Sequence, residues 1–259
     1  MTDSYYCGVD VGASTTKVVV INEAADVLGR AVVRSGMDFE AAAAECLEDV
    51  LSTSKLEKGA LARTISTGYG RRNVPFSDGN RTEITCHAKG CYHIFPRKIT
   101  VVDIGGQDNK IIHIDAGGGR SAFKMNRKCA AGTGAFLEEI AGKLNLPVGE
   151  LEGLARESKE EVTLGSFCTV FTQTEILAKI RRGAKIPDII KGAFRSVIKR
   201  IVEMDPLEGD VVLTGGVVAN NPVIIEMFAG QLGREVHVPP DPQCTGALGA
   251  ALFAREDSK

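Results

Sequence analysis

The stretches that decide the fold are "DVGASTTK" at residues 10–17 and "DIGGQDNK" at residues 103–110. Both fit one pattern, Asp-(Val or Ile)-Gly followed by four residues and a lysine, so the chain contains an internal repeat. Each copy follows a short apolar run and leads into a β-branched run, which predicts a strand, a tight turn and a returning strand. The repeat therefore indicates two related α/β domains with one such hairpin in each.

The repeated turn has the composition of a phosphate-binding loop. Its glycines let backbone N–H groups approach an anion closely and permit positive φ. A purely structural Asp-Gly turn is the alternative, but two copies at matching positions favour phosphate binding. The predicted phosphate-binding residues are Gly12, Ala13, Ser14, Thr15, Thr16 and Lys17 in the first copy, and Gly105 and Gly106 in the second.

Asp10 and Asp103 end the two predicted strands. A carboxylate in this position suits a magnesium ion held largely through water, which is how Mg²⁺ commonly meets proteins and polyphosphates. Two such hairpins facing each other would clamp a nucleotide. The chain has neither a Walker A pattern nor a G-x-G-x-x-G after a strand, so neither a P-loop nor a dinucleotide fold explains the phosphate signal.

Two further glycine-containing segments extend the predicted nucleotide site. In "VVLTGGVVANNP", at residues 211–222, a strand runs into two glycines and a helix follows from about Pro222, which suits close approach of an adenosine. "CTGALGAALFARE", at residues 244–256, predicts a small-residue helix that allows tight packing or a hinge. The candidate nucleotide contacts in and beside these segments are Gly215, Gly216, Ala219, Asn220, Gln243 and Gly246.

The chain has seven cysteines, an odd number, and in a reducing cytoplasm they should be thiols or metal ligands rather than disulfides. Cys7 lies in a strand-like run and Cys46 on the apolar face of a predicted helix, so both are expected in the core. In "CHAKGCYH", a helix would place His87 and Cys91 on one face, as two metal ligands can be. No second ligand pair follows at zinc-like spacing, so a packed helix with Cys86 and Cys91 buried is favoured.

Two other cysteines share a different context. "NRKCAAGTGAFLEEI", at residues 126–140, places Cys129 shortly before a predicted amphipathic helix, and "GSFCTVFTQTEIL", at residues 165–177, does the same for Cys168. Helix N-termini offer oriented N–H groups and a positive dipole end to an anionic group. The charged segment at residues 146–166, which joins the two motifs, is predicted to be a short helix and a loop.

The composition narrows the function classes. The 259 residues are 44% hydrophobic and 25% charged, which suffices for one large or two modest domains with a full core. The formal net charge is only −2, so no basic field indicates a nucleic-acid or membrane partner. The first residues lack the features of a signal peptide and no apolar run approaches bilayer length, so we expect a cytoplasmic protein.

In their order along the chain, "DVGASTTK", "DIGGQDNK", "LTGGVVANN" and "TGALGAAL" resemble the motifs of the actin, hexokinase and sugar-kinase superfamily, in which two RNase H-like domains close over ATP. Within it, "TGYGR", "CHAKG", "DIGGQD", "KCAAGTG" and "FCTVF" are similar to the activator ATPases of 2-hydroxyacyl-CoA dehydratases and the ATPase subunits of benzoyl-CoA reductases. The resemblance covers essentially the whole chain. It implies an actin-like α/β fold with domains at residues 3–98 and 99–244, a nucleotide cleft between them, and a C-terminal helix at 245–259 that returns to the first domain.

The resemblance also implies an ATP-hydrolysing iron-sulfur protein of anaerobic metabolism. It would pass a low-potential electron from a ferredoxin or flavodoxin to a 2-hydroxyacyl-CoA dehydratase or a related iron-sulfur reductase. Its cofactors would be ATP or ADP, Mg²⁺ and one 4Fe-4S cluster per homodimer, ligated by Cys129 and Cys168 of each copy. Asp10 and Asp103 would organise magnesium and water, and Gln107 would orient the attacking water.

Other functions stay open at this stage. A small-molecule kinase of the same superfamily would need a carboxylate base near the acceptor hydroxyl, and no residue marks one beyond the phosphate aspartates. An actin-like or chaperone-like scaffold would need polymer contacts or a peptide-binding domain, and the chain has no spare length for the latter. Activators of benzoyl-CoA reductases and of double-cubane cluster proteins have similar motifs, so the partner is not determined by the sequence.

Overall fold

The computed structural model of the chain describes residues 4–165 and 168–258. The described chain divides into two compact units. The first comprises the residues up to Ile99, the segment Ile112–Ala122 and the residues from Pro239 onward, and the second comprises Thr100–Ile111 and Phe123–Val238. The domain limits given above stay predictions, and residue 3, where the first was expected to begin, lies outside the described residues.

The first unit is built on a five-stranded sheet with the order β3-β2-β1-β4-β5. β1 pairs with β2 in antiparallel and with β4 in parallel orientation. The register places Asp10 opposite Lys17 across the β1–β2 hairpin, so the predicted strand, turn and returning strand are confirmed here. The strands are β1 (Tyr5–Val11), β2 (Thr15–Ile21), β3 (Val27–Arg34), β4 (Leu61–Thr67) and β5 (Gly79–Asn80).

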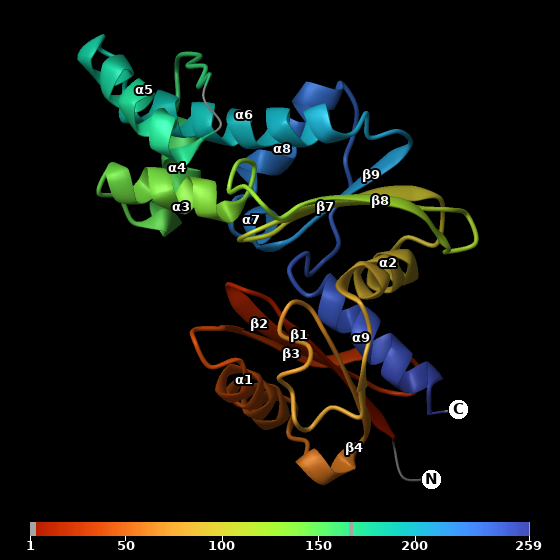
Figure 1. The fold of residues 1–259 in the computed structure, drawn as a ribbon. Helices are drawn as coiled ribbons and strands as arrows, with labels where there is room; N and C mark the ends of the chain where they lie inside the picture. The colour runs from red at the N-terminus through yellow and green to blue at the C-terminus, as the bar shows by residue number, and fades with distance from the viewer. Residues whose placement is uncertain (1–3, 166–167, 259) are drawn as a thin grey trace. The chain divides into compact units, whose positions relative to one another are not determined.

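Both faces of this sheet are buried, which explains why its central strands read as continuous apolar runs. Val18 of β2 belongs to one core with α1 (Phe39–Ser54), and its neighbour Val19 belongs to another with α9 (Thr245–Glu256). Successive side chains of a strand point to opposite faces, so the two helices cover opposite sides of the sheet. Figure 1 shows α1 and α9 in these positions within the first unit.

Helix α9 packs directly against backbone, which is why it consists of small residues. A Cβ atom added to Gly8 of β1 would overlap the carbonyl group of Ala247. A Cβ atom added to Gly249 would likewise overlap the carbonyl of Cys86 in α2 (Glu83–Ile94). Tight packing, one of the two roles predicted for this helix, is therefore confirmed, and α2 and α9 cross in close contact. The first unit also has a short 3₁₀ helix, η1 (Lys58–Ala60).

The second sheet has the order β8-β7-β6-β9. Its strands are β6 (Ile99–Ile104), β7 (Asn109–Ile114), β8 (Arg120–Asn126) and β9 (Asp210–Thr214). Apolar side chains of β6, β7 and β9 form one core with helices α3, α4, α6 and α8, which gather on one side of the strands in Figure 1. The helices of this part are α3 (Gly134–Lys143), α4 (Leu151–Glu157), α5 (Thr169–Arg181), α6 (Ile186–Met204), α7 (Gly216–Asn220) and α8 (Val223–Leu232).

The predicted helices are present, and α6 and α7 are additional. Pro222 precedes α8, as predicted, but the short helix α7 already follows Gly215. The segment between the two cysteine motifs contains η2 (Val148–Glu150) and α4, and then a loop, in agreement with the predicted short helix and loop. Among the described residues, no helix combines the length and apolar character needed to cross a bilayer.

Candidate functional site

The β1–β2 hairpin of the first unit brings an acid and a base together at its turn. Lys17 Nζ lies 3.3 Å from Asp10 Oδ2, and the Asp10 carboxyl is almost completely buried. The backbone N–H of Gly12 donates to the carbonyl of Thr15 at 3.0 Å, which closes the turn. The other carboxylate oxygen of Asp10, Oδ1, is buried and has no hydrogen-bond partner among the described residues. A buried carboxylate oxygen without a partner is unfavourable, so this atom is suited to accept a ligand.

The remaining predicted residues of this turn divide into two groups. Ala13 is exposed, and Ser14 and Thr15 are partly exposed, so the backbone of this segment is accessible. Thr16 is fully buried, and its hydroxyl lies 2.9 Å from the hydroxyl of Ser35, which donates to the carbonyl of Gly12 at 2.7 Å. The Thr16 hydroxyl therefore supports the turn, and a contact of Thr16 with phosphate stays a prediction.

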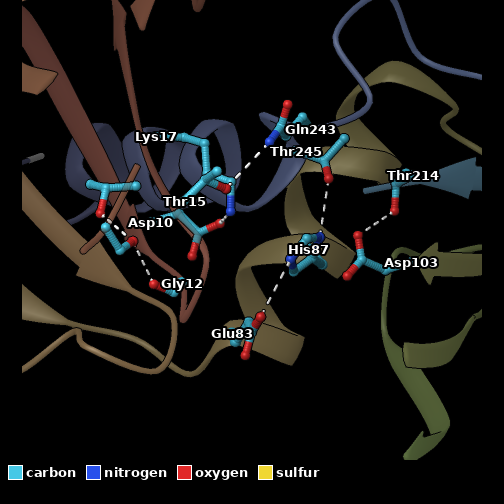
Figure 2. A network of polar contacts seen from close by, with 12 residues as sticks. Asp10, Gly12, Thr15, Lys17, Glu83, His87, Asp103, Thr214, Gln243 and Thr245 are labelled. Carbon is cyan, nitrogen blue, oxygen red and sulfur yellow. Dashed lines mark hydrogen bonds and ion pairs between the residues drawn. The ribbon is translucent and has the colours of Figure 1, made fainter. Parts of the chain in front are cut away.

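The second hairpin repeats the ion pair in a more completely bonded form. Lys110 Nζ donates to Asp103 Oδ2 at 3.1 Å and to Asp108 Oδ1 at 2.8 Å. The other oxygen of Asp103 accepts a hydrogen bond from the Thr214 hydroxyl at 2.9 Å (Figure 2). The prediction did not include Lys110 or Thr214. The internal repeat could have indicated Lys110, because it matches Lys17, whereas no signal in the sequence pairs Thr214 with Asp103.

The turn of the second hairpin is open at its tip. Gln107 is exposed, and Gly105 and Gly106 are partly exposed. The carbonyl groups of these two glycines accept hydrogen bonds from the N–H groups of Gly134 and Ala135 at the start of α3. The turn is thus fixed to the helix that follows the Cys129 motif.

The segment after β9 has the backbone conformation that requires glycine. Gly215 has a φ of 98°, and a Cβ atom there would overlap the backbone of Ile104. Gly216 begins α7 and is partly exposed, and Ala219 and Asn220 are exposed on that helix. Glycine at position 215 therefore permits close packing on β6, and contact of this segment with adenosine stays a prediction.

The segment before α9 reaches the first hairpin within the same unit. Gln243 Nε2 donates to Thr15 Oγ1 at 3.3 Å, and Figure 2 shows this contact beside the pair formed by Asp10 and Lys17. A Cβ atom added to Gly246 would lie 3.1 Å from Asp10 Oδ2. The fold therefore brings both of these predicted residues to the Asp10 turn, although more than 200 positions separate them from it in the sequence.

The seven cysteines, all of which lie among the described residues, fall into two classes. Five are buried and two, Cys129 and Cys168, are exposed. Burial raises the pKa of the buried thiols, to about 12 for Cys7, Cys46 and Cys86 and to about 11 for Cys244. Since the thiolate is the form that binds metal, these groups are poor ligands, whereas the exposed pair is accessible. Burial of Cys86 and Cys91 in α2 agrees with the favoured interpretation of "CHAKGCYH".

Each exposed cysteine lies at or near the start of a helix. Cys129 precedes α3, and its Sγ accepts a 3.5 Å hydrogen bond from the N–H of Ala131. Cys168 is the N-cap residue of α5, and its carbonyl accepts bonds from the N–H and the hydroxyl of Thr172, each at 2.8 Å. Ser166 and Phe167, which precede Cys168 in the second motif, lie outside the described residues. Within the described chain, no three His, Cys, Asp or Glu side chains cluster as ligands of one metal ion.

Two sheets covered by helices, each with an Asp–Lys hairpin at a glycine turn, are typical of the actin-like class of ATPases. The chain belongs to the BadF/BadG/BcrA/BcrD ATPase family, whose model matches residues 7–254. It is 41% identical, over 97% of its length and 98% of the relative's, to the activator of lactoyl-CoA dehydratase from Anaerotignum propionicum. This similarity supports the ATPase prediction over the small-molecule kinase.

Two solved structures have the same fold. Component A of (R)-2-hydroxyglutaryl-CoA dehydratase from Acidaminococcus fermentans is 37% identical, superimposes with a TM-score of 0.92, and is matched over 98% of both chains. The activator of 2-hydroxyisocaproyl-CoA dehydratase from Clostridium difficile, solved with bound ADPNP, is also 37% identical and has a TM-score of 0.91, over 98% of this chain and 95% of the other. The predicted actin-like fold and ATPase activity are thereby confirmed.

Proposed function

We propose that this ATPase donates a low-potential electron, through an iron-sulfur cluster, to a dehydratase that acts on a 2-hydroxyacyl-CoA. The observation that carries the proposal is the contrast among the cysteines, since two are exposed at helix starts and five are buried. The relatives named as dehydratase activators support the choice of partner.

The exposed thiols suit a cluster shared by two copies of the chain. A 4Fe-4S cluster takes four thiolate ligands, and one copy offers two accessible thiols in Cys129 and Cys168. A homodimer supplies the other two. The N-terminus of α5 directs N–H groups toward Cys168, which stabilises negative charge on a thiolate-ligated cluster. When bound, the cluster stores the electron that is passed to the partner.

Each hairpin turn is suited to bind phosphate of the nucleotide. The N–H groups of Gly12 and Gly105 close the turns by donating to the carbonyls of Thr15 and Asp108. The N–H groups of Ala13 and Gly106 are therefore the ones that hold phosphate oxygens, and Lys17 adds a positive charge. Asp10 and Asp103 suit Mg²⁺ held through water, and the unpartnered Oδ1 of Asp10 fits that task because it lacks another acceptor role. Magnesium would neutralise phosphate charge there.

The residues of the turns also determine the rate of ATP hydrolysis. Gln107 is exposed at the tip of the second turn, where an amide can orient a water molecule by hydrogen bonding. An amide is a poor general base, so we expect slow hydrolysis that is limited by conformation rather than by proton transfer. Lys110 holds the carboxylates of Asp103 and Asp108 in place from within the hairpin.

The free energy of ATP hydrolysis is sufficient to assist the electron transfer. Making a one-electron carrier more reducing by 100 mV requires only about 2.3 kcal/mol. We place the protein in the cytoplasm, where thiols stay reduced, with a ferredoxin or flavodoxin as electron source. A related iron-sulfur reductase could take the place of the dehydratase as the acceptor.

The experiment that tests this function measures nucleotide-dependent access to the cluster under anaerobic conditions. The rate at which an iron chelator removes the visible chromophore should change with ATP or a non-hydrolysable analogue and stay unchanged with ADP, because only the γ-phosphate distinguishes the two states. With ATP present, Asp10→Asn should lose its chromophore to the chelator at the rate that the wild type shows without nucleotide. Equal rates under all conditions would show that the cluster is a static link and that coupling to ATP is absent.

A further inference from the structure

His87, which the predicted nucleotide site did not include, lies in that part of the first unit. It is on α2, in the "CHAKG" segment, and only 4% of the residue is exposed. Its Nδ1 atom lies 3.0 Å from the hydroxyl of Thr245 at the start of α9. This contact fixes the plane of the imidazole and thereby the direction of its second nitrogen. Figure 2 shows the ring between Thr245 and Glu83.

The second nitrogen of His87 lies close to the Asp10 carboxylate. A Cβ atom at Gly246 would lie 3.0 Å from His87 Nε2 and 3.1 Å from Asp10 Oδ2. Because position 246 is glycine, α9 packs closely against both polar atoms, which come from different elements, α2 and β1, without a side chain between them. Glu83 Oε1 approaches the same nitrogen at 4.0 Å, and Lys17 Nζ lies 3.3 Å from Asp10 Oδ2.

An independent observation indicates that the Asp10 carboxylate receives a ligand through its other oxygen. Asp10 Oδ1 is buried and has no hydrogen-bond partner among the described residues, whereas both oxygens of Asp103 in the matching hairpin are bonded. Leaving a buried acceptor unpaired costs about 1–3 kcal/mol, and more for a charged group. The first hairpin therefore has a carboxylate oxygen that can accept a hydrogen bond from a ligand, whereas both carboxylate oxygens of the second hairpin are already bonded.

We propose that His87 is a positioning residue for the hydrated divalent cation of the nucleotide. Its Nε2 and the Asp10 carboxylate hold water of the cation's hydration shell, and Thr245 orients the ring for this contact. The inference rests on the proposed nucleotide site at the Asp10 turn. It explains why the start of α9 places a hydroxyl and then a glycine beside the imidazole: the hydroxyl orients the ring, and the glycine keeps a side chain from coming between Nε2 and the Asp10 carboxylate.

Two substitutions of His87 distinguish the roles of its two ring nitrogens. In His87→Gln the amide can reach the position of Nε2, and in His87→Asn it can reach that of Nδ1. The experiment measures binding of a fluorescent ATP analogue during a Mg²⁺ titration, together with kcat and KM for ATP. His87→Asn should raise the Mg²⁺ concentration for half-maximal binding, and lower kcat, by about 10–100-fold, the range typical of outer-shell partners of metal sites. His87→Gln should stay within about threefold of the wild type in both quantities, on the same scale.

A third variant crowds both polar groups without removing either. Gly246→Ala places a methyl group against both His87 Nε2 and Asp10 Oδ2, and alanine at a helical position favours the helix. It should weaken the Mg²⁺ dependence as His87→Asn does, while thermal unfolding shows a folded protein. If His87→Asn and Gly246→Ala both bind the Mg²⁺-nucleotide like the wild type, or if His87→Gln is the impaired variant, His87 serves only the packing of α2 on α9.

Asp10→Asn distinguishes failure of this inference from failure of the site on which it rests. If Asp10→Asn impairs Mg²⁺-dependent binding and His87→Asn does not, only the inference about His87 is wrong. If neither variant changes binding, the Asp10 turn is not the magnesium–nucleotide site and both proposals fail.

Discussion

Lys110 Nζ lies 3.1 Å from Asp103 Oδ2, and both side chains are almost entirely buried within the second hairpin. Lys17 and Asp10 form the equivalent pair at 3.3 Å in the first hairpin, where the lysine is more exposed. The second pair is closed by Thr214 and Asp108, whereas Asp10 keeps one oxygen without a partner among the described residues. The two copies of the repeat thus share the Asp–Lys pair but differ in whether a carboxylate oxygen is available to a ligand.

Removing the buried lysine should destabilise the protein more than removing its less buried counterpart. Lys110→Ala leaves the buried Asp103 carboxylate without its cation, and breaking a buried ion pair costs about 3–5 kcal/mol. Lys17→Ala should cost less than Lys110→Ala, because 13% of the Lys17 side chain is exposed, against 2% for Lys110, so water can partly replace its charge beside Asp10. Urea unfolding of the two variants measures the difference, and equal losses of free energy would contradict this account of the second hairpin.

Thiol labelling should separate the cysteines into the two classes that burial defines. In metal-free native protein, a maleimide should modify Cys129 and Cys168 rapidly and leave the other five unmodified, and all seven should react in denaturant. Mass spectrometry of the labelled peptides gives the count. Rapid modification of Cys7 or Cys46 in the folded protein would show that the core of the first unit is open.

The buried thiols should also make the protein less stable at alkaline pH. Their pKa values are raised in the folded state to between about 11 and about 12, from the ordinary 9.0. The free energy of unfolding is therefore at its full value below pH 9 and falls as the pH rises toward 12, because the unfolded chain loses these protons first. Cys7→Ala should make the decline between pH 9 and pH 11 shallower. Cys129→Ala, which removes an exposed thiol, should leave the slope as it is.

Asp10→Asn should lower Mg²⁺-dependent ATP hydrolysis by about 10–100-fold, because the charge that orders the cation and its water is lost. The brown colour of the cluster should persist, since the cysteine motifs lie in the other unit. Asp49→Asn, at an exposed position of α1, is the matched control and should retain wild-type hydrolysis. Wild-type hydrolysis by Asp10→Asn would mean that the first hairpin is a structural turn only.

The sequence predicted those parts of the fold that local patterns encode. The Asp–Gly–Lys repeat predicted both hairpins, since strand alternation and turn chemistry are properties of short segments. The small residues of 244–256 predicted close packing of α9, because a helix can approach backbone closely only where side chains are small. In the same way, an apolar context predicted that Cys7 and Cys46 are buried.

What the sequence did not predict depends on contacts between distant segments. His87 meets Thr245 across 158 positions, and no local pattern records that pairing. The Thr16 hydroxyl, predicted to contact phosphate, is buried 2.9 Å from the hydroxyl of Ser35, a contact across 19 positions that no local pattern records. Thr214 was overlooked for the same reason, because its partner Asp103 lies on another strand.

The iron content of anaerobically prepared protein tests the central claim most directly. If Cys129 and Cys168 of two copies ligate one 4Fe-4S cluster, the wild type should be a dimer with about four irons. Cys129→Ser and Cys168→Ser should each lose the iron and the brown colour, whereas Cys46→Ser and Cys91→Ser, at buried positions, should keep both. A full iron complement in Cys129→Ser, or in a monomeric wild type, would contradict the account.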